Sequence, residues 1–510
     1  MKRILFLLLV VSTFDMFGQA PPFKWVKKIP FEIVGQCSDS DDNVYISGAF
    51  SDTVTFENIL LTGNNYSSDL IIAKFDSTGS LLWYKQFGGP DDDGPVDMEI
   101  DQNGNLIATT FYNRSTIYYG DTIVAGANSH GAIIVKLSNN GDLVWYKIPG
   151  YNDNGCFHAY SSAIDQDNNI LILGNIQWGN GIFPDTIIPS QGHILGYLAK
   201  YNTDGDFEWV KAFLGDVSQF SFDGSNNVLI ITDSIRKYSP DGDYIWGRPV
   251  SAYLGNNNYS QLVADSLDNI YILGRFEDTV VVDGISYIAN GASDIIIIKY
   301  DYSGNPLWVN TAGGPKYDNP NSIFIKNGGL FMTGGFVERI FFDQDSLTSL
   351  SPIYSSAFVS EYDLAGNLKF IKKVGSKKTC TIGSIAVSKS IYLSGNGTDT
   401  VNFDNIEMVY GPYSTGYFLT RLEGEVIHPI FYPETFEIYP NPTQRMVTVN
   451  FNPDYRNVSI EIYNSQGRLM TSIALNQYNN NIDIGSLSRG LYIVKLKAEN
   501  IEISRKIEKL

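Results

Sequence analysis

Residues 74–83 read Lys-Phe-Asp-Ser-Thr-Gly-Ser-Leu-Leu-Trp, and residues 299–308 read Lys-Tyr-Asp-Tyr-Ser-Gly-Asn-Pro-Leu-Trp. This spacing, with an aromatic residue nine positions after a lysine, recurs along most of the chain. The aromatic residues of the series are Trp25, Trp83, Trp145, Trp209, Trp246, Trp308 and Phe370; Glu361 takes the place of the lysine before Phe370, and Trp25 precedes the first lysine of the series. Their intervals are 58, 62, 64, 37, 62 and 62 residues. A series this regular indicates an internal repeat.

Each repeat predicts four short strands. Between residues 94 and 149, alternating apolar residues indicate a strand that ends at Ile100, and the pair Asn103-Gly104 indicates a hairpin turn because glycine adopts the positive φ that such turns need. Three more strands are expected at Leu106–Phe111, Ala132–Leu137 and Leu143–Ile148. The repeat with the 37-residue interval keeps four strands and lacks only an excursion between the second and third. We therefore expect the excursion to be an ornament on a four-stranded unit.

Four-stranded antiparallel units in radial repetition are the blades of a propeller. Seven copies of the second strand predict an all-β chain with a seven-bladed β-propeller over residues 21–430. The segment Trp25–Ile29 matches a fourth strand and is expected to complete the last blade. These residues resemble the beta-propeller repeats of secreted bacterial proteins. That resemblance implies a fold and leaves the function open, since one fold hosts many functions.

The two ends of the chain differ from the repeats. Residues 1–20 contain Lys2 and Arg3, then the apolar run Ile4–Val11 and a small-residue exit at Ala20, which is the pattern of a signal peptide. No later segment is apolar for long enough to predict a transmembrane helix in the mature protein. Residues 21–430 carry a net charge of −21, whereas residues 431–510 carry +1, which indicates a domain boundary near residue 430.

The last segment, 431–510, alternates in hydrophobicity as a small immunoglobulin-like β-sandwich does. It contains Tyr439-Pro440-Asn441-Pro442, a turn at Gly467, the pair Gly490 and Tyr492, and a closing Lys506. These motifs resemble the type A C-terminal sorting domain of the type IX secretion system. The resemblance implies partners in the type IX secretion machinery and its sortase. It also implies a Bacteroidetes-type source and a secreted or outer-surface location, with attachment to surface lipopolysaccharide as one outcome.

Composition limits the partners. The net charge of −19 argues against nucleic acid, because phosphate binding needs clustered lysine and arginine. The loops expected at the propeller mouth are acidic and flanked by tyrosine. Their candidate ligand-binding residues are Asp91, Asp92, Asp93, Asp153, Asp318 and Tyr317. Carboxylates there could hold a cation or a polyol, or they could be turn residues that cap their own loops.

Two hairpin turns, Asp39–Asn43 and Asp165–Asn169, resemble half of a calcium loop but lack the distal glutamate. We therefore expect no metal and no other cofactor, with calcium as the alternative. The repeated lysine could form a basic ring; we expect instead that its stem packs on the aromatic residue of the next strand.

No catalytic motif is present: the sequence contains no HExxH, no G-x-S-x-G and no phosphate-binding glycine loop. We therefore assign no catalytic residue. The expected function is a non-catalytic binding or adhesion scaffold that presents the propeller to a glycan or protein ligand. The alternative is a secreted carbohydrate-active hydrolase or lyase that uses acidic residues at the mouth.

Overall fold

The computed structural model describes residues 20–63, 67–89, 92–113, 117–119, 122–125, 130–152, 156–214, 219–231, 234–249, 261–343, 345–422, 436–439, 445–451, 458–464, 468–474, 481–498 and 501–509. These residues form strands, turns and bends, and no helix occurs among them. The described part of the chain therefore also contains no helix with the length and hydropathy that a membrane crossing needs. The predicted all-β class is confirmed. The expected signal peptide lies almost wholly outside the described residues.

The repeats fold into four-stranded antiparallel groups, here called units 1 to 7. Units 1 and 2 are β2 (Glu32–Ser38), β3 (Val44–Ser51), β6 (Ser68–Phe75), β7 (Leu81–Gly88), and β8 (Gly94–Ile100), β9 (Leu106–Asn113), β12 (His130–Leu137), β13 (Leu143–Lys147). Units 3 and 4 are β15 (Cys156–Ile164), β16 (Ile170–Gln177), β19 (Ile194–Tyr201), β20 (Phe207–Leu214), and β21 (Gln219–Phe222), β22 (Val228–Ile231), β23 (Ser234–Tyr238), β24 (Tyr244–Pro249). Units 5 and 6 are β25 (Gln261–Ala264), β26 (Ile270–Phe276), β29 (Asp294–Tyr300), β30 (Pro306–Gly313), and β31 (Asp318–Lys326), β32 (Gly329–Val337), β35 (Ser355–Asp363), β36 (Leu368–Ser376). Unit 7 is β37 (Cys380–Val387), β38 (Ile391–Phe403), β39 (Ile406–Leu422) and β1 (Phe23–Ile29).

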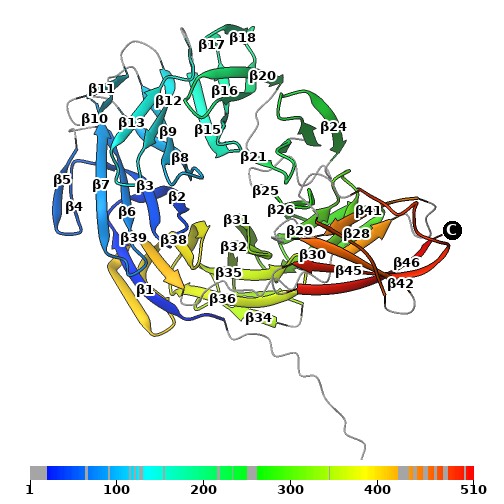
Figure 1. Ribbon diagram of the computed structural model, residues 1–510. Helices are drawn as coiled ribbons and strands as arrows, with labels where there is room; N and C mark the ends of the chain where they lie inside the picture. The colour runs from blue at the N-terminus through cyan, green and yellow to red at the C-terminus, as the bar shows by residue number, and fades with distance from the viewer. Residues whose placement is uncertain are drawn as a thin grey trace, which may run out of the picture.

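The units stand side by side around a common centre (Figure 1). The first strand of each unit contacts the first strand of the next, from β2 through β8, β15, β21, β25 and β31 to β37, and β37 contacts β2. Hydrogen bonds reinforce several of these contacts. Asp97 of β8 accepts from Ser161 Oγ and Ser162 N at 3.1 and 3.0 Å, and Asn321 of β31 donates to Ile382 O at 2.7 Å.

The excursions are hairpins, and several of them join neighbouring units. The hairpins are β4 (Thr53–Phe56) with β5 (Ile59–Thr62), β10 (Ile117–Tyr119) with β11 (Thr122–Ala125), β17 (Asn180–Phe183) with β18 (Thr186–Pro189), β27 (Thr279–Val282) with β28 (Ile285–Ile288), and β33 (Arg339–Phe342) with β34 (Asp345–Thr348). Strand β10 pairs with β7 of unit 1, and β33 pairs with β30 of unit 5. Strand β17 pairs with the short β14 (Tyr151–Asn152), and the end of β38 pairs with β36. The hairpins are additions to a four-stranded unit, as expected, since unit 4 keeps its four strands without one; β10, β17 and β33 in addition extend the preceding sheet, whereas β4–β5 and β27–β28 form two-stranded sheets of their own.

The repeated tryptophan packs on the turn of the next unit. A left-handed glycine lies in each of these turns, between the third and fourth strands, and an added Cβ would approach the preceding tryptophan ring. The glycine–tryptophan pairs are Gly79–Trp25, Gly141–Trp83, Gly205–Trp145, Gly242–Trp209, Gly304–Trp246 and Gly366–Trp308. Indole Nε1 also donates to a turn carbonyl, from Trp83 to Asn139 O at 3.0 Å and from Trp308 to Leu364 O at 3.3 Å. The repeated tryptophan and glycine therefore form the contact between neighbouring units, here called the joint.

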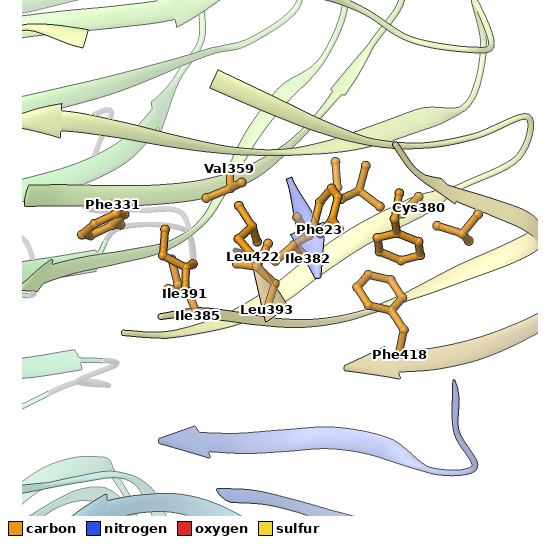
Figure 2. Packing of buried hydrophobic residues seen from close by; sticks show 14 of the residues in the cluster. Phe23, Phe331, Val359, Cys380, Ile382, Ile385, Ile391, Leu393, Phe418 and Leu422 are labelled. Carbon is orange, nitrogen blue, oxygen red and sulfur yellow. The ribbon is translucent and has the colours of Figure 1, made fainter. Parts of the chain in front are cut away.

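Strand β1 completes unit 7, as the sequence predicted. It pairs antiparallel with β39, with Val26 opposite Thr420. Figure 2 shows Phe23 of β1 among core residues that include Cys380, Leu393 and Phe418. Trp25 then bonds Ser77 O of unit 1 at 3.0 Å. The two ends of the repeat region therefore meet in one sheet.

The C-terminal segment forms two sheets. One contains β40 (Phe436–Tyr439), β41 (Met446–Phe451) and β44 (Asn481–Asp483); the other contains β42 (Ser459–Asn464), β43 (Leu469–Ala474), β45 (Gly490–Ala498) and β46 (Ile501–Lys509). Buried side chains of both sheets, such as Val449 and Ile460, share one hydrophobic cluster. The alternating hydrophobicity of this segment indicates most of these strands, but β40 and β43 were not predicted from it.

Candidate functional site

Two loops of the same sequence pattern define the candidate face. Residues 88–93 and 313–318 both read Gly-Gly-Pro-x-x-Asp, and each links the last strand of one unit to the first strand of the next. Each loop meets the segment that enters the third strand. Asp93 N donates to Ser68 O at 2.9 Å, and Asp318 N donates to Ser293 O at 3.0 Å. The loops between units and the segments that lead into the third strands therefore lie on the same face.

The structure does not gather the predicted acidic residues into one cluster. Asp93 lies at the joint of units 1 and 2 and Asp318 at the joint of units 5 and 6, and both are fully buried. Asp92 is exposed, and its Oδ1 accepts from Ser68 N and Ser68 Oγ at 2.9 and 3.1 Å. Asp91 and Asp153 lie outside the described residues. The buried pair is therefore unsuited to direct contact with a surface ligand.

Among the predicted site residues that the structure describes, Tyr317 and Asp92 are accessible. The Tyr317 ring is 54% exposed, and the Arg275 guanidinium lies 6.0 Å from its centroid. Other exposed aromatic side chains accompany units 2 and 3, namely Tyr151, Tyr160 and Trp178. An aromatic ring beside a cation and carboxylates suits stacking on a sugar or peptide ring.

The sequence reasoning missed Asp294. It lies at the start of β29, five residues before the repeated Lys299, and is buried against Gly313. Burial raises the pKa of Asp318 to about 8, with a further contribution from the Asp294 carboxylate, while the Gly314 amide opposes the shift. The signal in the sequence was that Asp69 occupies the same position before Lys74, followed by the same Gly-Gly-Pro loop.

The repeated lysine has a structural role, as expected, but its polar partner was also missed. In five units its Nζ pairs with an aspartate of the first hairpin: Lys74–Asp39 at 3.2 Å, Lys136–Asp101 at 2.9 Å, Lys200–Asp165 at 3.2 Å, Lys237–Asp223 at 2.6 Å and Lys299–Asp265 at 3.8 Å. Lys74 and Lys136 also lie near aromatic rings, at 4.7 and 5.8 Å. The half calcium loops at Asp39 and Asp165 are therefore ion-paired turns.

A second acidic group lies on β8. Asp97 and Glu99 are half-buried. Burial raises the pKa of Glu99 to about 8, with the Asp97 carboxylate adding to the shift and Lys326 opposing it. Burial also raises the pKa of Asp97 against the hydrogen bonds from Ser162, Met98 and Ser161. These carboxyls are protonated near neutral pH more readily than ordinary ones.

A cavity of about 940 Å³ lies beside β36 and the hairpin formed by β38 and β39. Its polar lining has mixed charge: Lys372, Lys373, Lys377, Asp399, Asp404 and Glu407. Lys372 is paired with Asp404 at 2.8 Å, and Lys373 donates to Thr348 O at 2.7 Å. Much of this charge is therefore already internally compensated.

The motif residues of the C-terminal segment occupy defined positions where the structure describes them. Tyr439 ends β40, and Gly490 begins β45. Tyr492 is buried and donates from Oη to Ser488 O at 2.8 Å, and Lys506 on β46 lies opposite Ile493. Pro440, Asn441, Pro442 and Gly467 lie outside the described residues.

Comparison with known proteins identifies this segment. Residues 437–509 match a family described as a secretion system C-terminal sorting domain. The segment is a type IX sorting domain, and the protein is secreted or placed on the outer cell surface. The sequence-based expectation of its location is confirmed.

Other similarities are more remote. The chain is similar to an uncharacterised WD repeat-containing protein of Acanthamoeba polyphaga mimivirus, with 22% identity over 82% of this chain, and it spans 37% of the length of that relative. Two solved structures are similar: the quinohemoprotein alcohol dehydrogenase from Comamonas testosteroni (10% identity, 83% of this chain, 79% of that chain, TM-score 0.41) and a protein of unknown function from Bacteroides caccae (11%, 59%, 89%, TM-score 0.30).

Proposed function

We propose that residues 21–430 form a closed seven-bladed propeller, that residues 431–510 form a separate immunoglobulin-like sorting domain, and that residues 1–20 are a signal peptide. The contact between β37 and β2 and the pairing of β1 with β39 support closure. The Trp25–Gly79 contact supports closure further. It joins unit 7 to unit 1 by the same glycine–tryptophan packing that joins other neighbouring units.

We further propose a non-catalytic binding or adhesion scaffold that type IX secretion delivers to the cell surface, where a glycan or protein is the ligand. One observation carries this proposal: the equivalent Gly-Gly-Pro loops lie at two separate joints, with exposed Asp92 at one and exposed Tyr317 at the other. Catalysis needs one convergent constellation, whereas binding can use equivalent positions around a ring.

Binding and turnover can be separated on the purified full chain. We expect selective binding on a glycan array, weakened by Tyr317→Ala and unchanged by Tyr302→Ala, which removes a comparably exposed tyrosine from a turn in unit 5. No reducing sugar should be released. Failure to bind any glycan or surface protein would contradict the proposal.

The alternative, a carbohydrate-active hydrolase or lyase, was expected to use acidic residues at the mouth; Asp97 and Glu99 of β8 are a further candidate pair for it. A carboxyl with a raised pKa beside a second carboxyl is the pattern of a general acid with its partner. Sustained sugar release that Glu99→Gln abolishes, while binding is retained, would establish this alternative and displace the scaffold role.

A further inference from the structure

Asp294 and Asp318 form a carboxyl pair inside the joint of units 5 and 6. Their exposed fractions are 4% and 0%. Two neighbouring glycines, Gly313 and Gly314, contact the two carboxyls. The Asp294 carboxyl lies against Gly313, where an added Cβ would be 2.0 Å from Asp294 Cγ. Gly314 N donates to Asp318 Oδ2 at 2.7 Å. The chain thus brings two carboxyls from β29 and β31 to one buried place.

One oxygen of each carboxyl is held by the backbone and one is not. Asn290 N donates to Asp294 Oδ2 at 2.8 Å, as Gly314 N does to Asp318. Within the described part of the chain, the Oδ1 atoms of both residues are buried without a hydrogen-bond partner. A buried carboxylate oxygen without a donor is costly, so the arrangement calls for a cation or a proton.

The rest of the protein shows how this fold normally neutralises a buried aspartate. In units 1 to 5 the first-hairpin aspartate receives the repeated lysine, as in Lys136–Asp101 at 2.9 Å. Burial raises the pKa of both Asp294 and Asp318, and one backbone amide opposes the shift at each. The Asp294 carboxylate raises the pKa of Asp318 further, and no cation lowers either value within the described part of the chain. This pair therefore lacks the compensation that the repeat supplies elsewhere.

The two carboxyls also occur together in the sequence. The loop Gly-Gly-Pro-x-x-Asp occurs at 88–93 and 313–318, and both times an aspartate, Asp69 or Asp294, stands five residues before the repeated lysine. At that position the other units have Gly131, Leu195, Thr232, Ser356 and Gly416. Joint occurrence indicates that the two residues serve one purpose together.

We propose that the Asp294–Asp318 pair binds a hard divalent cation of the calcium type, which ties β29 to β31 and so fastens unit 5 to unit 6. Carboxylate oxygens are the preferred ligands of such an ion. The described residues bring no group of three or more His, Cys, Asp or Glu together, so backbone carbonyls and water complete the shell. Two carboxylates predict a Kd at the weak extracellular end, about 10⁻⁴–10⁻³ M.

Calcium chloride and the chelator EDTA test this on the full chain. At pH 8, we expect calcium at roughly ten times the Kd to raise the midpoint of thermal unfolding by a few degrees. Calorimetric titration should lose one binding site in both Asp318→Asn and Asp294→Asn. Asp206→Asn, which neutralises an exposed carboxylate, is the control and should titrate as the wild type does.

Two outcomes would overturn the inference. The first is wild-type stoichiometry in both asparagine variants, which places any calcium elsewhere. The second is a stability that falls as pH rises from about 5 to 8 and ignores calcium, because a carboxyl with a raised pKa loses its proton over that range. That result would mean that the pair shares a proton instead of a metal.

Discussion

At the scale of single residues, the turn glycines have two roles: they adopt a positive φ, and some of them also leave space for a tryptophan ring of the preceding unit. Gly141 has φ +82°, and its missing Cβ leaves room for the Trp83 ring of the preceding unit. Gly104 has nearly the same conformation, φ +79°, but open space around it. Substitution at Gly104 therefore measures the backbone strain of a left-handed residue alone, whereas substitution at Gly141 adds the steric conflict with Trp83.

Gly104→Ala is expected to destabilise the protein by about 1–2 kcal/mol, the cost of a left-handed alanine. Gly141→Ala should cost about 1–3 kcal/mol more, because its Cβ would stand 2.9 Å from Trp83 and force the ring aside. Urea unfolding of both variants measures the difference. Equal losses would show that tryptophan packing does not hold the joint.

Lys136 and Asp101 form a buried pair, with side chains 9% and 0% exposed, whereas Lys147 and Asp206 form an exposed pair in contact at 2.8 Å. Lys136→Met should lower the free energy of unfolding by about 3–5 kcal/mol, because it leaves a buried carboxylate unpaired. Lys147→Met, the matched control, should change little, since exposed pairs contribute little. Similar losses in both variants would contradict a special role for the repeated lysine.

Acid should weaken these ion-paired turns. Burial alone would raise the pKa of Asp101, but hydrogen bonds from Asn105 and Lys136 hold it below its ordinary value, and Asp39 behaves likewise. A carboxyl with a lowered folded-state pKa stabilises above its unfolded pKa and loses that contribution as pH falls. We expect unfolding free energy to decline below about pH 4, and the decline should be shallower in Asp101→Asn.

At the scale of elements, the sequence predicted what is local and missed contacts between residues that lie far apart along the chain. The strands near Ile100, Leu106, Ala132 and Leu143 were predicted because alternation and Asn-Gly turns act within one hairpin. The lysine's aspartate partner and the pairing of Asp294 with Asp318 depend on register across strands, which one repeat does not reveal. The pairing of β10, β17 and β33 with the preceding sheet was missed for the same reason.

Unit 4 should be the least protected of the seven units. It has no excursion hairpin, its strands are short, and in the described part of the chain neither of its joints shows the hairpin pairing seen at β7 or β30. Fewer ladder hydrogen bonds mean a smaller free energy of local opening. Hydrogen–deuterium exchange should be fastest in β21–β24; slower exchange there than in unit 6 would contradict this account.

At the scale of the whole molecule, the pairing of β1 with β39 is the seam that brings the two ends of the repeat region together, and the proposed ring would open there. Residues 26 and 420 face each other there although most of the chain separates them. Elsewhere, the neighbouring strands of a unit follow one another along the chain and are joined by turns or by a hairpin excursion. The seam therefore relies on pairing, on Phe23 in the core of unit 7 and on Trp25 in the joint to unit 1.

A cross-link at this seam tests closure directly. In Val26→Cys with Thr420→Cys, oxidation should raise the free energy of unfolding by about 2–4 kcal/mol, because the disulfide closes a very long loop and prevents β1 from leaving β39. The reduced double variant is the control, since it carries the same substitutions without the bond. If oxidation leaves the unfolding midpoint unchanged, the ring opens first at another joint, and unit 4 is the place where exchange should then reveal it.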